Sequence, residues 1–183
     1  MKKIIFFVFV VILAVFGSVF AQETEVEEKI LNFETIGEMV TWETTAEDIY
    51  ELLSEFDIEV DVEQDDEYGK TISASKETEG EHFIYVFYFD EVTELLWEVE
   101  CVTALYDSEQ IIPAFQSIYE SYGFEDAEPY ENETLAEYAA DFDESYCVAG
   151  DGTIALLAGK AETEESYGQI ALVLINRSYF EEM

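Results

Sequence analysis

The sequence predicts an α+β fold in which an antiparallel meander of strands carries two helices packed on one face. Two segments repeat apolar residues at helical spacing, and most other segments alternate apolar and polar residues as half-buried strands do. These segments follow one another as helix, strands, helix, strands. The order leaves open a duplicated helix-plus-strands unit with halves 35–105 and 106–183.

Residues 1–21 have the pattern of a secretory signal peptide. Lys2 and Lys3 precede a continuous apolar run, and small residues lead to a cleavage position after Ala21. An uncleaved anchor is the alternative, because residues 4–21 approach the roughly 20 apolar residues that span a bilayer. We expect cleavage, no stable membrane insertion afterwards, and a secreted or periplasmic protein.

Residues 22–34 are polar and acidic, which indicates a flexible lead-in, and residues 35–183 form the predicted single domain. The domain opens with a short strand or an extended segment over 35–42. Thr44 and Glu47, three residues apart, form a capping box at the start of the first helix. The apolar stripe of this helix has i, i+3, i+4 spacing and consists of Ala46, Ile49, Tyr50, Leu53 and Phe56.

Four strands of the meander follow, at residues 58–64, 70–76, 82–89 and 95–105. In the fourth, alternation places Trp97, Val99 and Cys101 on one face. Glu98 and Glu100 fall on the opposite face, which we expect to be mostly solvent-exposed.

The third of these strands is apolar on both faces. Phe83, Tyr85, Phe87 and Phe89 share one face, and Ile84, Val86 and Tyr88 share the other. Such a strand belongs in the middle of a sheet. Because the predicted helices cover only one face, the other needs a loop, the acidic lead-in or a partner as its cover.

The second helix is predicted over residues 107–123, where Gly123 is a suitable C-terminal stop. Its apolar stripe consists of Ile111, Ile112, Phe115, Ile118, Tyr119 and Tyr122. Residues 124–140 have a weaker pattern. Three more strands follow, at residues 145–150, 152–159 and 168–175.

The chain has a formal net charge of −37, which falls to −39 when Lys2 and Lys3 leave with the signal peptide. A basic surface for phosphate backbones is missing, so nucleic acid is excluded as a partner. The acid is compatible with a salt-adapted coating, or with a field that attracts a cationic protein or peptide. Crowded carboxylates also predict weak, non-specific binding of divalent cations.

Cys101 and Cys147 are the only cysteines of a chain predicted to enter an oxidising compartment. A disulfide between them is the natural pairing, and two buried free thiols are the alternative. Two cysteines and one histidine do not have zinc spacing. Asp61, Glu63 and Asp65 alternate as in a calcium loop, but the sixth position lacks the required glycine. We therefore predict no metal site.

Catalytic signatures are missing from the sequence, including nucleophile elbows, phosphate loops and zinc-protease motifs. We therefore expect no enzyme activity, no catalytic residues and no cofactor. A carboxylate-dependent extracellular hydrolase is a weaker alternative, because an acidic chain offers many carboxylate pairs by chance.

The segment VTWETTAEDIYELL, the strong meander, the helix ending YESYGF and the closing GDGTIAL resemble small exported bacterial α/β modules. The shape is similar to units of the outer-membrane assembly lipoprotein family and of the β-lactamase inhibitor proteins. The resemblance covers roughly residues 35–176, and the chain departs from it in its acidity and in lacking a lipidated cysteine. It implies a non-catalytic module that binds proteins or serves as a scaffold.

We therefore expect an exported, acidic binding or interaction module for a protein or peptide. The aromatic-rich strands supply the candidate binding residues, which are Phe83, Ile84, Tyr85, Val86, Tyr88 and Trp97. A structural envelope protein with a salt-adapted surface is the alternative.

Overall fold

The computed structural model describes residues 31–66, 69–78, 81–105, 108–150, 152–160 and 168–182. The predicted signal peptide and most of the predicted lead-in lie outside these residues. Within them, no helix combines the length and the apolar character that a membrane crossing requires.

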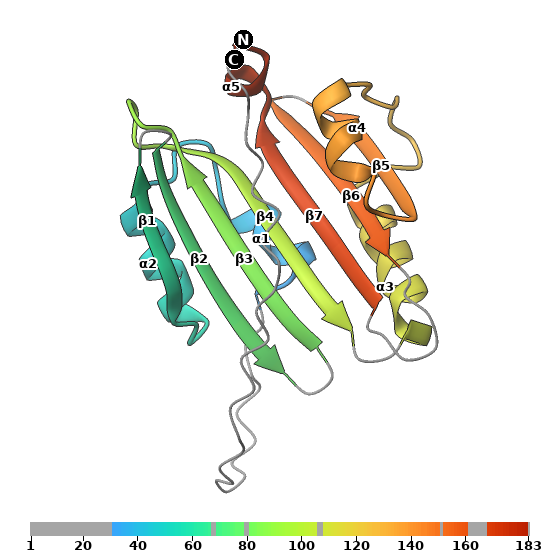
Figure 1. Cartoon of the computed structure of the whole chain (residues 1–183), viewed down its shortest axis with the longest axis horizontal. Helices are drawn as coiled ribbons and strands as arrows, with labels where there is room; N and C mark the ends of the chain where they lie inside the picture. Colours follow the sequence, from blue (N-terminus) through green and yellow to red (C-terminus); the bar gives the residue numbers. More distant parts are fainter. Residues whose placement is uncertain are drawn as a thin grey trace, which may run out of the picture.

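One antiparallel sheet of seven strands organises the described chain, in the order β1-β2-β3-β4-β7-β6-β5 (Figure 1). The strands are β1 (Val60–Asp66), β2 (Gly69–Thr78), β3 (Glu81–Phe89), β4 (Leu96–Leu105), β5 (Glu144–Ala149), β6 (Thr153–Lys160) and β7 (Gly168–Asn176). The predicted α+β class and antiparallel sheet are thus confirmed. β3, β4 and β7 lie in the middle, which agrees with their apolar sequences.

Helices lie on both faces of the sheet, whereas the sequence predicted only two helices, packed on one face. On one face lie α1 (Phe33–Met39), α2 (Ala46–Glu55) and α3 (Ser108–Ser121). The shorter α4 (Glu133–Ala139) and α5 (Arg177–Glu182) pack on the other. Sequence patterns of one or two turns are too short to show a helical stripe, so α4 and α5 escaped prediction.

The short strand predicted over residues 35–42 is also wrong, because α1 occupies this position. Asn32 and Thr35 stabilise its start: the Thr35 N–H donates to Asn32 Oδ1 at 3.0 Å, and the Asn32 N–H donates to Thr35 Oγ1 at 3.1 Å. This reciprocal cap lies partly in the predicted lead-in. Leu31 and Phe33 are buried, so the end of that segment belongs to the core.

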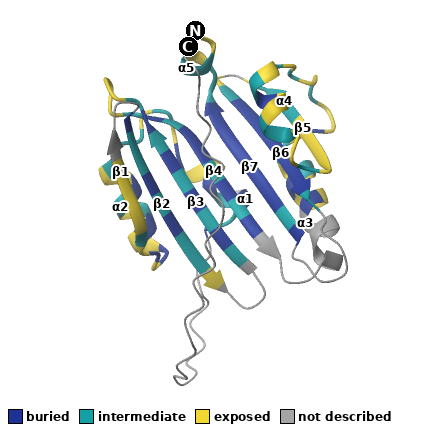
Figure 2. Cartoon of the chain, in the orientation of Figure 1, coloured by how far each residue is buried: buried dark blue, intermediate teal, exposed yellow. Residues whose placement is uncertain are grey.

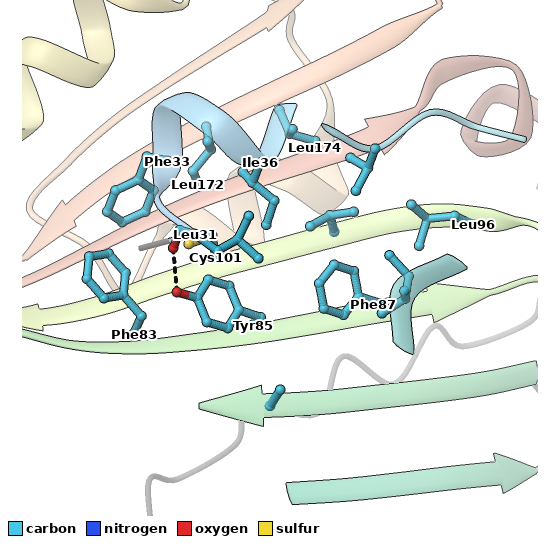
Figure 3. Close-up of a cluster of buried hydrophobic side chains, with 14 of the residues drawn as sticks. Leu31, Phe33, Ile36, Phe83, Tyr85, Phe87, Leu96, Cys101, Leu172 and Leu174 are labelled. Carbon is cyan, nitrogen blue, oxygen red and sulfur yellow. Dashed lines mark hydrogen bonds between the residues drawn. The ribbon is translucent and has the colours of Figure 1, made fainter. Parts of the chain in front are cut away.

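The main core lies between the sheet and α1–α3. Figure 3 shows Phe83, Tyr85 and Phe87 of β3 pointing to the same side, toward Phe33 and Ile36 of α1. The Tyr85 hydroxyl donates a hydrogen bond to the carbonyl of Leu31. A buried tyrosine needs such a partner, and this bond connects the first described residue to the central sheet.

Helix α2 begins one residue later than its predicted capping box. Thr45 is the N-cap: its backbone N–H donates to the Asp48 carboxylate at 2.7 Å, and its hydroxyl accepts from the Asp48 N–H at 3.4 Å. Thr44 instead accepts from the Thr41 N–H in the preceding turn. The capping chemistry was predicted correctly, but the residues that provide it were not.

A β-bulge in β4 moves Trp97 to the face opposite α1–α3. Glu98 pairs with Tyr88, but Leu96 pairs with Phe89, so Trp97 is an extra residue. Leu96 is buried in the main core, whereas Trp97 packs with the cluster under α4 and α5. The prediction that Trp97 shares a face with Val99 and Cys101 is therefore wrong.

The predicted disulfide is also wrong, because Cys101 and Cys147 are both free. Cys101 belongs to the main core, and Cys147 packs against the cluster on the opposite face. Their strands, β4 and β5, are separated by β7 and β6. With neighbouring strands about 4.8 Å apart, the two residues lie beyond the roughly 7 Å Cα separation that a disulfide spans.

The proposed duplication of a helix-plus-strands unit, with halves 35–105 and 106–183, stays a prediction. Each half contributes two helices followed by a meander, and the two meanders meet where β4 pairs with β7. However, α1 and α2 cover the same face, whereas α3 and α4 lie on opposite faces.

Candidate functional site

The face of β3 and β4 that points away from α1–α3 is the candidate site, and we name it the platform. Its side chains are Ile84, Val86, Tyr88, Trp97, Glu98, Glu100 and Val102. Directly opposed residues of neighbouring strands share a face, and the pairs Ile84–Val102, Val86–Glu100 and Tyr88–Glu98 are directly opposed.

Neither helix on this side of the sheet lies over β2 and β3. In Figure 1, α4 lies over β5 and β6, and α5 lies beyond the end of β7. Figure 2 shows half-buried positions alternating with buried ones along β2 and β3. Ile84, Val86 and Tyr88 are among these half-buried residues. They are the apolar residues of β3 that face this side of the sheet.

The structure divides the predicted binding residues into two groups. Phe83 and Tyr85 are 3% and 0% exposed in the main core, so they stabilise the fold. Ile84, Val86, Tyr88 and Trp97 come together on the platform. The bulge is what brings Trp97 to this group, and periodicity alone could not show it.

Aromatic rings border the platform at the Trp97 end. The Trp97 ring lies 5.8 Å from Tyr88 and 5.1 Å from Tyr179 of α5, measured between centroids. The Tyr179 hydroxyl donates to Asp90, and burial together with this carboxylate raises the pKa of Tyr179 to about 12. The Trp97 ring is stacked on Tyr179 and tilted against Tyr88, and the three rings provide an apolar edge.

Glu98 and Glu100 are the polar residues of the platform, and their burial contradicts the predicted solvent-exposed face. Glu98 is 2% exposed, and Glu100 is half-buried. They lie between Tyr88 and Val86 of β3 on one side and Ile175 and Val173 of β7 on the other. The two glutamates occupy alternate positions of β4, so their side chains lie on the same face of the sheet.

This environment favours the protonated state of the pair. Burial, followed by the neighbouring Glu100 carboxyl, raises the pKa of Glu98 well above its ordinary value. Burial raises the pKa of Glu100 to about 7, and the hydrogen bond with Glu98 acts in the opposite direction. Burial and the two glutamates also raise the pKa of Tyr88 and of Tyr138 in α4. In the described part of the chain, no lysine or arginine contributes to either glutamate shift.

Sequence reasoning missed this pair because acids at alternate positions usually indicate a solvent-exposed face. The apolar character of the two strands that flank β4 could have indicated that these glutamates are buried. β3 and β7 are apolar on both faces, so a strand between them is flanked by apolar side chains on both faces. Using that signal requires the strand order, which the sequence pattern does not supply.

A concave feature lies at the β5 edge, with a volume of about 870 Å³. Its walls include Tyr119, Tyr130, Tyr146 and Cys147. Burial raises the pKa of the Cys147 thiol to about 11, so the sulfur is a thiol and a weak nucleophile at neutral pH. The Tyr130 N–H donates to the Cys147 carbonyl at 2.8 Å, so the segment before α4 partly protects this edge strand.

Glu98 and Glu100 lie two residues apart on the same face of β4, so their carboxyl groups can share a proton. Within the described residues, no group of three His, Cys, Asp or Glu side chains is placed to hold a metal ion.

Comparisons of the chain with protein-family models, with curated proteins and with solved structures find no match. The functional inference therefore depends on the fold and on the platform.

Proposed function

We propose that this protein is an exported, non-catalytic module that binds a protein or peptide through the platform. The observation that supports this most directly is the half-buried apolar strip of Ile84, Val86 and Tyr88 on β3, a strand over which Figure 1 shows neither α4 nor α5. Export rests on the signal-peptide pattern of residues 1–21. The likeness to outer-membrane assembly lipoproteins and β-lactamase inhibitor proteins stays part of this proposal.

The partner we propose is a cationic, amphipathic peptide segment. Its apolar side chains would pack on Val86, Tyr88 and Trp97, and its lysine or arginine would meet the carboxyl groups beside them. A chain with a formal charge of −37 attracts such a segment over long range and repels a second copy of itself.

The alternative of a salt-adapted envelope protein is supported by the distribution of acid away from the platform. Glu47, Glu51 and Glu55 are exposed on α2, and Asp61 and Glu63 are exposed on β1. Coating of this kind keeps a protein soluble without serving recognition.

Binding to an array of synthetic peptides tests the proposal. We expect peptides with alternating aromatic and lysine or arginine residues to bind the mature protein, and acidic peptides of the same apolar content not to bind. Val86→Thr should weaken binding about tenfold by placing a hydroxyl in the apolar contact. Val92→Thr is the matched control, because Val92 is 86% exposed in a turn outside the platform.

Equal binding by both variants would contradict the platform as the binding face. Two other occupants of this face would also overturn the proposal. A concentration-dependent dimer in sedimentation, abolished by Val86→Thr, would identify a second copy. Peptide binding that appears only after deletion of residues 22–30 would identify the lead-in as the natural cover.

A further inference from the structure

The outer edge of β5 carries the concave feature described above, which we name the β5 groove, and the platform does not include it. We propose that the β5 groove binds an extended, cationic peptide segment, which pairs with β5 as an added strand. β5 lies three strands away from β4 in the sheet, so this second site is independent of the platform.

β5 is an edge strand, and only its C-terminal half is paired on the outer side (Figure 1). There the Tyr130 N–H donates to the Cys147 carbonyl at 2.8 Å, and Pro129 forms a bridge with Val148. Alternate residues of an antiparallel strand direct both main-chain groups to the same side, so the Cys147 N–H and both groups of Ser145 also point outward. Outside the sheet, no other backbone hydrogen bond to Ser145 or Cys147 is found in the described chain. Edge groups of this kind are those that an added strand uses.

The β5 groove has a volume of about 870 Å³ and extends over both faces of this edge. On the α3 side its wall is aromatic, since the ring centroid of Tyr119 lies 5.7 Å from that of Phe124 and 4.7 Å from that of Tyr146. On the opposite side the wall includes Leu135 and Ala136 of α4. An extended peptide directs alternate side chains to opposite faces, so a peptide paired with β5 would place side chains against both walls.

The charge of the β5 groove favours a cationic peptide. Its described lining includes the exposed Glu125, Glu131 and Glu133, and no lysine, arginine or histidine. Tyr130, which also lines it, already contacts a guanidinium, because Arg177 Cζ lies 5.9 Å from its ring centroid. A second copy of this acidic chain would be repelled. We therefore expect the groove to select peptides with an apolar centre flanked by lysine or arginine.

Amide hydrogen exchange of the mature protein, followed by NMR, tests the proposal with the peptide acetyl-KKVFVKK-amide as the probe. At a peptide concentration about ten times the dissociation constant measured by calorimetry, we expect exchange of the Ser145 and Cys147 amides to slow about tenfold. The Tyr146 and Val148 amides point toward β6 and should change little.

Two control peptides separate strand pairing from attraction between charges. Acetyl-EEVFVEE-amide keeps the apolar centre and reverses the charge. The probe methylated at its three central amide nitrogens keeps every side chain and loses the N–H donors that an added strand needs. Neither control should slow exchange at Ser145 or Cys147, and an equal effect of the methylated probe would overturn strand pairing.

Variants locate the bound peptide. Ser145→Pro removes an outward N–H without removing a bond to β6, and it should weaken binding by roughly three- to tenfold. Ala136→Lys places a cation in the α4 wall and should also weaken binding. Glu137→Lys is the matched control, because Glu137 is the next residue of α4, is exposed and does not line the groove. An equal or larger loss in Glu137→Lys would show that the overall field, not the groove, holds the peptide.

Failure of this inference is distinguishable from failure of the proposed function. No binding of the probe at millimolar concentration, or binding with unchanged exchange at Ser145 and Cys147, would overturn the groove, whereas the peptide array and Val86→Thr would still decide the platform. Slow exchange of both amides before the probe is added would also overturn it, because a second copy or another part of the chain would then pair with this edge.

Discussion

At the scale of single residues, the carboxyl groups of Glu98 and Glu100 determine how folding stability depends on pH. Both pKa values are raised in the folded state, to about 7 for Glu100 and well above the ordinary value for Glu98. An unfolded glutamate titrates near about 4.3. The folded state therefore binds more protons above that pH, and its stability falls as the pH rises through the folded values.

We expect the free energy of unfolding to decrease between pH 5 and 8. Glu100→Gln should reduce this slope and raise stability at pH 8 by about 1–3 kcal/mol, because no charge is then buried at this position. Urea unfolding at each pH measures this free energy of unfolding for both the parent protein and the variant. Glu91→Gln is the control, because Glu91 is exposed in the turn after β3. An equal gain in both variants would show that general charge repulsion, not burial of the pair, causes the slope.

At the scale of elements, short polar caps and close helix–sheet contacts determine which segments form helices and where they pack. Asn32 caps α1, Thr45 caps α2 and Asn132 caps α4. These caps explain how helices of seven residues such as α1 and α4 begin, because each satisfies N–H groups that a first turn leaves without intrahelical partners.

Thr45→Ala should destabilise the protein by about 1 kcal/mol, because it removes the side chain that accepts from the third residue of α2. Thermal unfolding of Thr45→Ala and Thr44→Ala side by side measures the effect. The Thr44 change should have the smaller effect, since Thr44 bonds to an exposed turn. The reverse order would place the cap where the sequence pattern predicts it.

Gly159 of β6 permits close packing of α3 against the sheet. A Cβ at this position would lie 2.8 Å from the Phe115 ring, which is too short for a non-bonded contact. We expect Gly159→Ala to cost about 1–3 kcal/mol in urea unfolding, because the ring must move. Gly150→Ala is the matched control, since its Cβ would meet nothing closer than 3.9 Å. Similar urea midpoints of unfolding for both variants would mean that α3 shifts to accommodate the methyl group without a loss of stability.

At the scale of the whole molecule, the negative charge opposes folding while the seven-stranded sheet and its two clusters favour it. Only a few described side-chain ion pairs offset this charge, among them Lys70–Glu63 at 2.8 Å and Arg177–Glu181 at 2.9 Å. Repulsion distributed over a surface is screened by salt.

The melting temperature should therefore rise with sodium chloride between 0.02 and 0.5 M. We expect an increase of about 2–8 °C, for screening worth on the order of 1–2 kcal/mol in a chain of this size. Calorimetry measures the transition, and sucrose of equal osmolality controls for solvent effects that do not involve charge. A constant melting temperature would mean that repulsion contributes little to stability.

The sequence by itself determined the antiparallel strands, helices α2 and α3, and the apolar character of both faces of β3. Each has a period long enough to identify it locally. Only the tertiary structure decided the strand order, the bulge at Trp97, the separation of Cys101 from Cys147 and the burial of Glu98 and Glu100. These features depend on which distant segments pair, and pairing is a contact between strands that local periodicity does not encode.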